Sequence, residues 1–252
     1  MPESLAVPVE LSPLDEARFG VRAARAKNLT ADLLPQVMNL CNQWKVQFLI
    51  ARCSTQDLPA VQAMQRRGFL LMDTLVYFRY DLEQMALPQR REVDIRSVRT
   101  DDTELIGRIA RQAFQGYGGH YHADQRLDRA SCNDLYVDWA VRSCTHKELA
   151  DEVLVVELAE ELVGFLTIRV LENQVADGRL YAVLPRARGR GIGQALLIEG
   201  LHWSKSHAMK AMMISTQITN TASQISWARV GFVPHESFYT FHKWFEKRPE
   251  DD

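Results

Sequence analysis

The stretch from Leu180 to Leu201 constrains the fold most, because three kinds of local structure follow one another within it. An apolar run at residues 180–184 has the length and composition of a β-strand, and Pro185 ends it because proline cannot donate to a sheet ladder. A glycine-rich turn follows, and after Gly193 the apolar residues recur at helical spacing. The sequence therefore predicts a strand, a tight turn and a helix in that order.

The composition of this turn indicates an anion-binding site. The first N–H groups of a helix lack partners within the helix and carry partial positive charge. Gly189, Gly191 and Gly193 would let a phosphate approach the backbone, and the arginines between them add donors and charge. A packing turn with solvated arginines is the alternative. The spacing fits neither the dinucleotide fingerprint nor a P-loop.

The run Arg188-Gly189-Arg190-Gly191-Ile192-Gly193 resembles the acyl-CoA pyrophosphate loop of GNAT-superfamily N-acyltransferases, which carry [Q/R]-x-x-G-x-[G/A] after a strand. Asn220 and the pair Gly231-Phe232 follow in the order and spacing of a second motif of that superfamily. The resemblance covers roughly residues 93–244. It implies an α/β (α+β) GNAT fold, with a mixed central sheet flanked by helices, and N-acyltransferase activity with acetyl-CoA or another short acyl-CoA as co-substrate.

The resemblance also implies which residues hold the co-substrate. Backbone groups of Ala182 and Val183 would hold the thioester, and the N–H groups of residues 188–194 would hold the diphosphate. Asn220 occupies the position that contacts pantetheine in relatives, and it is equally suited to cap the helix that begins at Thr221. The predicted co-substrate residues are Ala182, Val183, Arg188, Gly189, Arg190, Gly191, Ile192, Gly193, Gln194 and Asn220.

Acyl transfer to an amine requires a proton to leave the acceptor and a thiolate to depart. Many relatives have a tyrosine four residues before the Gly-Phe pair whose hydroxyl protonates the thiolate, but this chain has Trp227 there, and an indole N–H is a poor acid. Tyr239 is the predicted substitute acid, with His242 as the alternative. Either could be a packed strand residue, and the thiolate could leave without a protein acid. His122 or Asp124 is the predicted base.

Residues 117–124 are rich in glycine and ring side chains and predict a loop that binds the acceptor. Sugars stack on aromatic faces, and His and Asp can orient hydroxyls, although ring residues in a loop are often only packed. This loop, residues 136–139 and the tail at 215–239 resemble bacterial nucleotide-amino-sugar N-acetyltransferases of surface-polysaccharide synthesis, which implies a nucleotide-linked amino-deoxysugar as acceptor. The predicted acceptor-side residues are Tyr117, His120, Tyr121, Asp124, Tyr136 and Trp139.

A weak internal repeat predicts two parts. The tripeptide Ser-Thr-Gln at residues 54–56 precedes a short helix and a Gly-Phe pair, and the same order recurs from residues 215–217. Residues 1–87 contain no R-x-x-G-x-G and are predicted to be a degenerate GNAT-like subdomain, with the catalytic GNAT domain at 88–252 and a linker at 87–91. Chance similarity of two βαβ segments is the alternative.

Composition excludes several other classes of protein. A net charge of −2 over 252 residues argues against a general binder of nucleic acid or anionic membranes. No apolar run reaches transmembrane length, and the N-terminus lacks a signal-peptide pattern. The four cysteines lack C-x-x-C spacing, which predicts reduced thiols and a cytoplasmic location.

No histidine-carboxylate cluster has metal-ligand spacing, so no metal is predicted. The expected partner is a small-molecule amine, with no nucleic acid and no membrane, and a homodimer is left open. Two rival functions stay open as well: a protein or peptide N-acetyltransferase, and a non-catalytic module that binds acyl-CoA.

Overall fold

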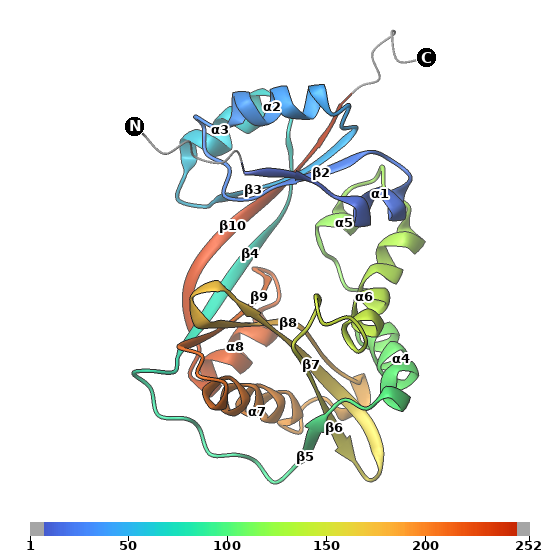
Figure 1. Ribbon diagram of the computed structural model, residues 1–252, viewed down its shortest axis with the longest axis vertical. Coiled ribbons are helices and arrows are strands. Elements are labelled where there is room, and N and C mark those ends of the chain that lie inside the picture. The colour runs from blue at the N-terminus through green and yellow to red at the C-terminus, as the bar shows by residue number, and fades with distance from the viewer. Residues whose placement is uncertain (1–7, 246–252) are drawn as a thin grey trace. The chain divides into compact units, whose positions relative to one another are not determined.

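The computed structural model describes residues 8–245, which fall into two compact units (Figure 1). Unit 1 contains the described residues up to Leu75, Gly118–Ser131 and the described residues from Glu236 onward. Unit 2 contains Val76–Tyr117 and Cys132–His235. These units do not divide at the boundary expected between residues 87 and 88, because two later segments of the chain group with the N-terminal residues. The functional division into a degenerate and a catalytic part stays a prediction.

Unit 1 is built on a mixed sheet. Its strands, in sheet order, are β1 (Val9–Leu11), β2 (Ala23–Ala26), β3 (Phe48–Ser54), the part of β10 (Val233–Trp244) from Glu236 onward and the first half of β4 (Leu70–Asp81). Strands β2 and β3 run parallel, whereas β10 is antiparallel to β3 from Phe238 opposite Ser54 to Trp244 opposite Phe48. The partner of β3 therefore comes from the opposite end of the chain.

Helices α2 (Leu34–Gln43) and α3 (Leu58–Arg66) supply the hydrophobic core of unit 1. Buried Leu34, Val37 and Cys41 recur at helical spacing on α2, so one face of this helix packs into the core. The Asp57 carboxylate caps α3 by accepting from the Ala60 N–H at 2.9 Å, which satisfies a donor in the first turn of the helix. The remaining helices of this unit are α1 (Pro13–Phe19) and the short α5 (His120–Ala123).

The strands of unit 2 also belong to a mixed sheet. In sheet order they are the start of β10, up to His235, the second half of β4, β9 (Ala211–Gln217), β8 (Val175–Val183), β7 (Glu161–Leu171), β6 (Glu152–Leu158) and β5 (Asp94–Ser97). Strands β5 to β8 form an antiparallel meander, and β9 pairs in parallel with β8. Strands β6 and β7 form a hairpin, with Ala159 and Glu160 at positive φ in its turn.

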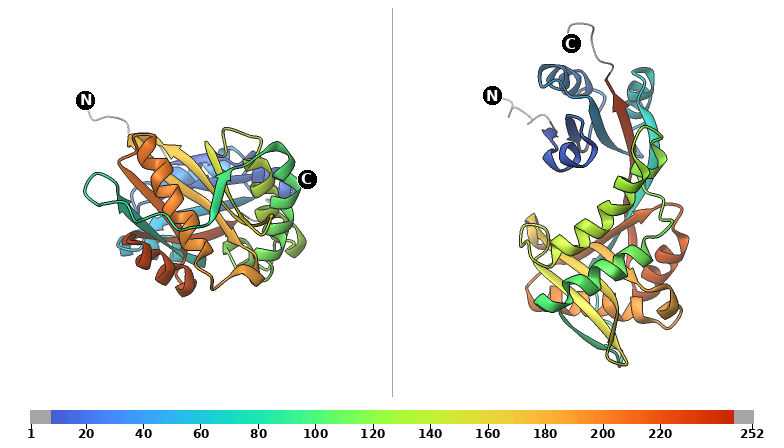
Figure 2. Two further views of the ribbon diagram at one scale, coloured as in Figure 1. Left: turned by 90° about the horizontal axis from the view of Figure 1, so that it is seen from below. Right: turned by 90° about the vertical axis from the view of Figure 1, so that its right-hand side faces the viewer.

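Helices cover both faces of this sheet. They are α4 (Thr103–Ala113), α6 (Arg129–Ser143, of which the part from Cys132 belongs to unit 2), α7 (Ile192–Ser206) and α8 (Thr221–Val230). Figures 1 and 2 show α4 and α7 on opposite faces. A β-carbon on Gly200 of α7 would lie 2.8 Å from Leu166 Cδ2 of β7, so the absence of a side chain there lets helix and sheet pack closely.

The four cysteines are free thiols. Cys41, Cys53 and Cys132 are buried, and Cys144 is partly exposed. Burial raises the pKa of Cys41 to about 12 and the pKa values of Cys53 and Cys144 to about 11. Within residues 8–245, no helix is long and apolar enough to cross a membrane, and no group of three or more His, Cys, Asp or Glu side chains could hold a metal ion.

Candidate functional site

Strands β8 and β9 stop pairing before their carboxyl ends. They pair in parallel from Val175 opposite Ala211 to Gly178 opposite Ile214, but β8 continues to Val183 and β9 to Gln217. From Leu180 to Val183, where β9 no longer pairs with it, β8 still pairs with β7 on its other side. The β8 edge that faces β9 is therefore open to an extended ligand beyond Gly178, where Ala182 and Val183 lie.

A β-bulge precedes this divergence. In the pairing of β7 with β8, Thr167 lies opposite Leu180 and Ile168 opposite Gly178, so Arg179 is an extra residue on β8. The Thr167 hydroxyl accepts from the Leu180 N–H at 3.0 Å and so satisfies a backbone donor at the irregularity. Sequence analysis missed the first part of β8, since polar Asp177 and Arg179 interrupt its apolar pattern.

The predicted turn between β8 and α7 is confirmed. Gly189 and Gly191 have φ of +79° and +75°, a left-handed backbone conformation that favours glycine. The Ala195 N–H donates to the Gly191 carbonyl at 3.0 Å, which closes the first turn of α7. The N–H groups of Ile192, Gly193 and Gln194 precede that bond and have no acceptor within the helix. These are the donors that the sequence predicts for an anion-binding site, and their binding of an anion stays a prediction.

Two arginines of this loop are held by other parts of unit 2. Arg188 donates through Nε to the Val183 carbonyl and through Nη2 to the Ala113 carbonyl, each at 3.1 Å. Arg186 forms a bidentate ion pair with Glu161. These side chains fix the loop to β8, α4 and β7, so the loop would offer a ligand its backbone N–H groups rather than these two guanidinium groups.

Asn220 caps α8, which was the alternative left open by the sequence. Its Oδ1 accepts from the Ser223 N–H at 3.3 Å, and its Nδ2 donates to the Thr216 hydroxyl at 2.9 Å. A contact of Asn220 with the co-substrate stays a prediction.

Trp227 lies inside unit 2. Its side chain is 3% exposed and packs edge-on against Phe78, with the ring centroids 5.6 Å apart. Its indole Nε1 is buried and has no hydrogen-bond partner among the described residues. A buried donor in this state is uncommon, because its desolvation is not offset by a hydrogen bond.

The predicted acceptor-side residues divide between the two units. In unit 2, Tyr136 stacks on Phe114 and meets Tyr117 edge-on, with ring centroids 5.0 Å apart in both pairs. The Tyr117 hydroxyl donates to the side chain of Gln217, the last residue of β9. Tyr117 thus reaches the strand end beside which β8 and β9 diverge, and Trp139 follows Tyr136 on α6.

In unit 1, the structure brings His120 and Asp124 together with His242. Asp124 Oδ2 lies 2.7 Å from His242 Nδ1, and His242 Nε2 lies 2.9 Å from His120 Nδ1. Trp244 Nε1 also donates to Asp124 Oδ2, at 2.9 Å. Burial opposes ionisation of Asp124, but the hydrogen bonds from His242 and Trp244 outweigh it and lower its pKa. From the sequence, Asp124 and His120 are predicted on the acceptor side and His242 as an alternative acid. No local pattern joins His242 to the other two, because it is distant from them in the chain.

Tyr121 belongs to a partly buried ion-pair network. Its hydroxyl donates to Asp15 Oδ1 at 2.8 Å and accepts from Arg25 Nη2 at 2.6 Å. Arg25 also binds both carboxylate oxygens of Asp15, at 2.6 and 2.8 Å. These contacts give Tyr121 a structural role, whereas its predicted contact with the acceptor is untested.

The predicted catalytic residues Tyr239 and His122 both lie in unit 1. Tyr239 pairs with Cys53 across β10 and β3 and packs against the hydrophobic core of the unit. His122 Nδ1 accepts from the Gly119 N–H at 3.3 Å, within the turn that carries it. Their catalytic roles stay predictions.

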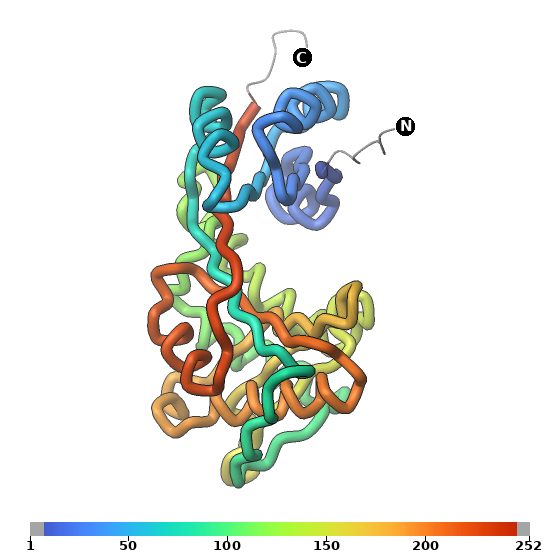
Figure 3. The backbone as a smooth tube through the Cα atoms, turned by 90° about the vertical axis from the view of Figure 1, so that its left-hand side faces the viewer, coloured from blue at the N-terminus to red at the C-terminus, as the bar shows by residue number. Residues whose placement is uncertain are grey.

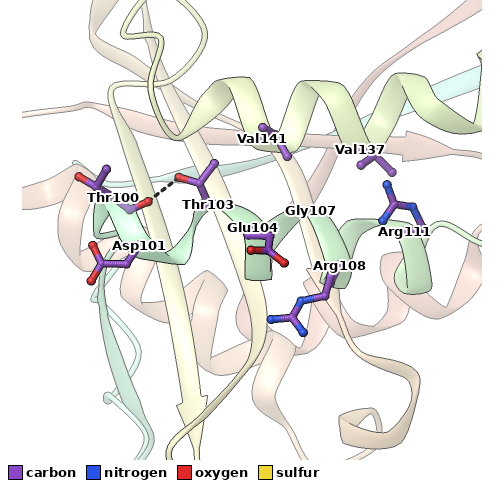
Figure 4. A pocket seen from close by; sticks show the side chains of 9 residues that line it. All are labelled: Thr100, Asp101, Thr103, Glu104, Gly107, Arg108, Arg111, Val137 and Val141. Atoms are coloured by element: carbon purple, nitrogen blue, oxygen red, sulfur yellow. Dashed lines mark hydrogen bonds between the residues drawn. The ribbon is translucent and has the colours of Figure 1, made fainter.

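An open groove lies between α4 and α6 (Figure 4). The Thr103 hydroxyl donates to the Thr100 carbonyl at 2.9 Å at one end of it. None of the residues predicted to bind co-substrate or acceptor lines this groove. The residues that line it are Thr100, Asp101, Thr103, Glu104, Gly107, Arg108, Arg111, Val137 and Val141.

Residues 111–232 match the Acetyltransferase (GNAT) family. This segment contains the divergent β8 and β9, the glycine-rich loop and the capped helix α8. The chain therefore carries a GNAT acetyltransferase domain, the catalytic domain of N-acetyltransferases that use acetyl-CoA as co-substrate.

Several named relatives are similar to this chain. The dTDP-fucosamine acetyltransferase of Escherichia coli is 23% identical, over 94% of this chain and 99% of that protein. The spore coat polysaccharide biosynthesis protein SpsD of Bacillus subtilis is 22% identical, over 79% of this chain and 68% of that protein. The mycothiol acetyltransferase of Nocardia farcinica is 29% identical over 71% of this chain, but the match spans only 59% of that protein.

Solved structures agree on the fold. A GCN5-related N-acetyltransferase from Sphaerobacter thermophilus superposes with a TM-score of 0.65, at 13% identity, over 94% of this chain and 76% of that one. The predicted fold class, a mixed sheet flanked by helices, is confirmed.

Proposed function

We propose that this protein transfers an acetyl group from acetyl-CoA directly to the amine of a nucleotide-linked amino-deoxysugar. The observation that carries the proposal is the similarity to dTDP-fucosamine acetyltransferase, which extends over nearly the whole of both chains. A match of this extent reaches well beyond residues 111–232, the segment that matches the GNAT family and contains all six predicted acceptor-side residues. The similarity to a polysaccharide biosynthesis protein favours the same class of substrate.

The proposed co-substrate site lies in unit 2. The diphosphate would accept hydrogen bonds from the N–H groups of residues 188–194, which begin α7. The thioester would lie along the open edge of β8, where backbone groups of Ala182 and Val183 would hold it. Successive N–H groups of a strand point to opposite edges, so the one of these two that points away from β7 could stabilise the oxyanion of a tetrahedral intermediate. Asn220 would contact pantetheine while it caps α8.

In the proposed reaction the neutral amine attacks the thioester carbonyl carbon. The C–N bond forms, the C–S bond breaks and the electron pair leaves with the sulfur. The amine proton passes to His122 or Asp124, and Tyr239 or water protonates the thiolate. His242 is less suited to this role than Tyr239, because Asp124 and His120 already engage both of its ring nitrogens.

The proposal places the protein in surface-polysaccharide synthesis and in the cytoplasm, where free thiols persist. Residues 1–87 would be a degenerate GNAT-like subdomain, and residues 88–252 would be the catalytic domain. A homodimer remains compatible with it.

The deciding experiment is an acceptor panel. Purified protein is given acetyl-CoA with nucleotide-linked amino sugars, the corresponding sugars without amines, and basic peptides, and release of free CoA is measured. Release with the amino sugars alone is expected. Release with peptides alone would establish the rival peptide N-acetyltransferase. Binding of acetyl-CoA without turnover of any acceptor would favour the non-catalytic module.

The loop assignment has its own test. Gly191→Glu places a carboxylate where the diphosphate would bind and should strongly weaken acetyl-CoA binding in calorimetry. Gly20→Glu is the matched control, because Gly20 also has a left-handed backbone conformation (φ +66°) but has open space around its Cα and lies in unit 1. Both variants therefore incur the same backbone penalty and charge change. Equal affinities for acetyl-CoA would refute the loop assignment.

A further inference from the structure

Arg91 approaches the glycine-rich loop from a segment that is distant in sequence. Its Nη2 donates to Gln194 Oε1 at 2.5 Å, in the first turn of α7. A β-carbon on Gly191 would collide with Arg91 Nη1, so the guanidinium lies directly over that glycine. Gly191 is thus favoured by its positive φ, and its lack of a side chain leaves room for the Arg91 guanidinium.

The segment that carries Arg91 is held along α7 at successive points (Figure 3). His202 Nε2 donates to the Pro88 carbonyl at 2.9 Å. Arg90 binds both carboxylate oxygens of Glu199, at 2.6 and 3.0 Å. Arg91 then reaches Gln194, so the segment runs toward the N-terminus of α7 and delivers Arg91 there. The predicted linker is therefore a strap that is bound to the helix.

A second side chain from outside the loop converges on the same turn. A β-carbon on Gly193 would collide with the Tyr181 hydroxyl, so this hydroxyl is aimed at the helix N-terminus. Burial raises the pKa of Tyr181, which keeps the hydroxyl protonated and able to donate. Within the described residues no hydrogen bond engages it, although the residue is partly buried. Such a donor, aimed at backbone N–H groups that also lack acceptors, favours an acceptor-rich ligand at this point.

Three of the other arginines around the loop are already engaged by partners. Arg186 is neutralised by Glu161, Arg188 is engaged by backbone carbonyls, and Arg90 is neutralised by Glu199. The partner of Arg91 is the neutral amide of Gln194, so its positive charge is not compensated by that contact. An anion at the loop would meet this charge together with the partial charge of the helix N-terminus.

We propose that Arg91 binds a phosphate of acetyl-CoA, as a ligand supplied by the strap at residues 88–91 from outside the loop motif. This inference rests on the proposed assignment of residues 188–194 as the diphosphate site. The Tyr181 hydroxyl, which lies beside Gly193, donates to the same phosphate group.

The test compares two adjacent arginines. Arg91→Gln and Arg90→Gln remove the same charge one residue apart, but only Arg91 reaches the loop. Calorimetry with acetyl-CoA should show that Arg91→Gln weakens binding by about tenfold or more, the effect of losing a charge-assisted hydrogen bond. Arg90→Gln should change the affinity by less than about twofold, since an exposed ion pair contributes little. Tyr181→Phe should weaken binding severalfold, and circular dichroism should show all three variants folded.

Dephospho-CoA identifies the phosphate. If the effect of Arg91→Gln persists with this ligand, Arg91 binds the diphosphate; if the effect disappears, Arg91 binds the 3′-phosphate. Either result supports the proposal. Equal affinities of wild type, Arg91→Gln and Arg90→Gln would overturn it, and the loop assignment would stand if Gly191→Glu still abolished binding. Failure of the folded wild-type protein to bind acetyl-CoA would instead refute the proposed function.

Discussion

His242 and Asp124 are joined in unit 1 by a hydrogen bond of 2.7 Å between Nδ1 and Oδ2, although 118 residues separate them in the chain. The ionised carboxylate favours a proton on His242 Nδ1, which leaves Nε2 to accept from His120 Nδ1. Burial and the nearby His242 lower the pKa of His120 well below its usual value, with Arg52 and Arg25 acting in the same direction. His120 is therefore a neutral histidine that the fold keeps from charging.

This arrangement predicts a pH-dependent stability. The unfolded chain binds a proton at His120 below about pH 6.5, whereas the folded chain does not, so the free energy of unfolding should fall as the pH decreases through that value. The pKa of Asp124 is lowered in the folded state, so the contribution of Asp124 to the free energy of unfolding should be lost only below about pH 4. Thermal unfolding between pH 8 and pH 5 measures the first effect. The variant His120→Gln should show a flatter profile, and identical profiles would contradict the assignment.

Tyr121 should matter for stability. Tyr121→Phe removes the hydroxyl that bridges Asp15 and Arg25, and loss of these charge-assisted hydrogen bonds should lower the free energy of unfolding by about 1–3 kcal/mol. Denaturant unfolding measures this change, and acceptor KM should be unaffected. Unchanged stability with a raised KM would show instead that Tyr121 binds the acceptor.

Replacement by phenylalanine should affect turnover differently at Trp227 and at Tyr239. Trp227→Phe removes a buried N–H that has no partner among the described residues, and turnover should stay within about twofold because an indole is not an acid of useful strength. Tyr239→Phe should reduce kcat by about a hundredfold if its hydroxyl is the acid. Full activity of Tyr239→Phe would leave water as the proton donor.

Gly164 should be essential for the geometry of β8. A β-carbon at Gly164 would lie 2.7 Å from the Ala182 carbonyl oxygen and 3.1 Å from Val156 Cγ1, so Gly164→Ala must shift the backbone that is proposed to hold the thioester. Acetyl-CoA turnover should fall at least tenfold, since small displacements at a reacting centre are costly. Folding is checked by circular dichroism, and wild-type turnover in a folded Gly164→Ala protein would refute the proposed thioester position.

A fragment of residues 1–87 should not fold alone. Strand β3 would lose β10 along seven paired positions, and the partly buried ion pair of Asp15 with Arg25 would lose Tyr121. Circular dichroism should show no cooperative thermal transition. Adding a peptide of residues 236–245 should not restore one, since residues 118–131 would still be missing. A cooperative transition in the fragment would contradict the assignment of these segments to one unit.

The contrast between local and non-local features explains what the sequence could predict. The strand, turn and helix around Gly189 and Gly191 were predictable, because propensity, glycine conformation and spacing act within about twenty residues. The contacts of Arg91 with Gln194, and of Asp124 with His242, were not predictable because they join segments that only the fold brings together. The same reason accounts for the two units, since a weak repeat in the N-terminal residues could not reveal that β10 completes their sheet.

The buried thiols make the enzyme convenient to assay. Each acetyl transfer releases one free CoA, whose sulfhydryl reacts with an aromatic disulfide dye at neutral pH. Cys41, Cys53 and Cys132 are shielded from such a dye, and the raised pKa of Cys144 keeps that partly exposed sulfur protonated and unreactive. The native protein should therefore contribute almost no background colour. Dye uptake by the protein itself would report loss of its folded state, so a single absorbance trace can follow both turnover and inactivation.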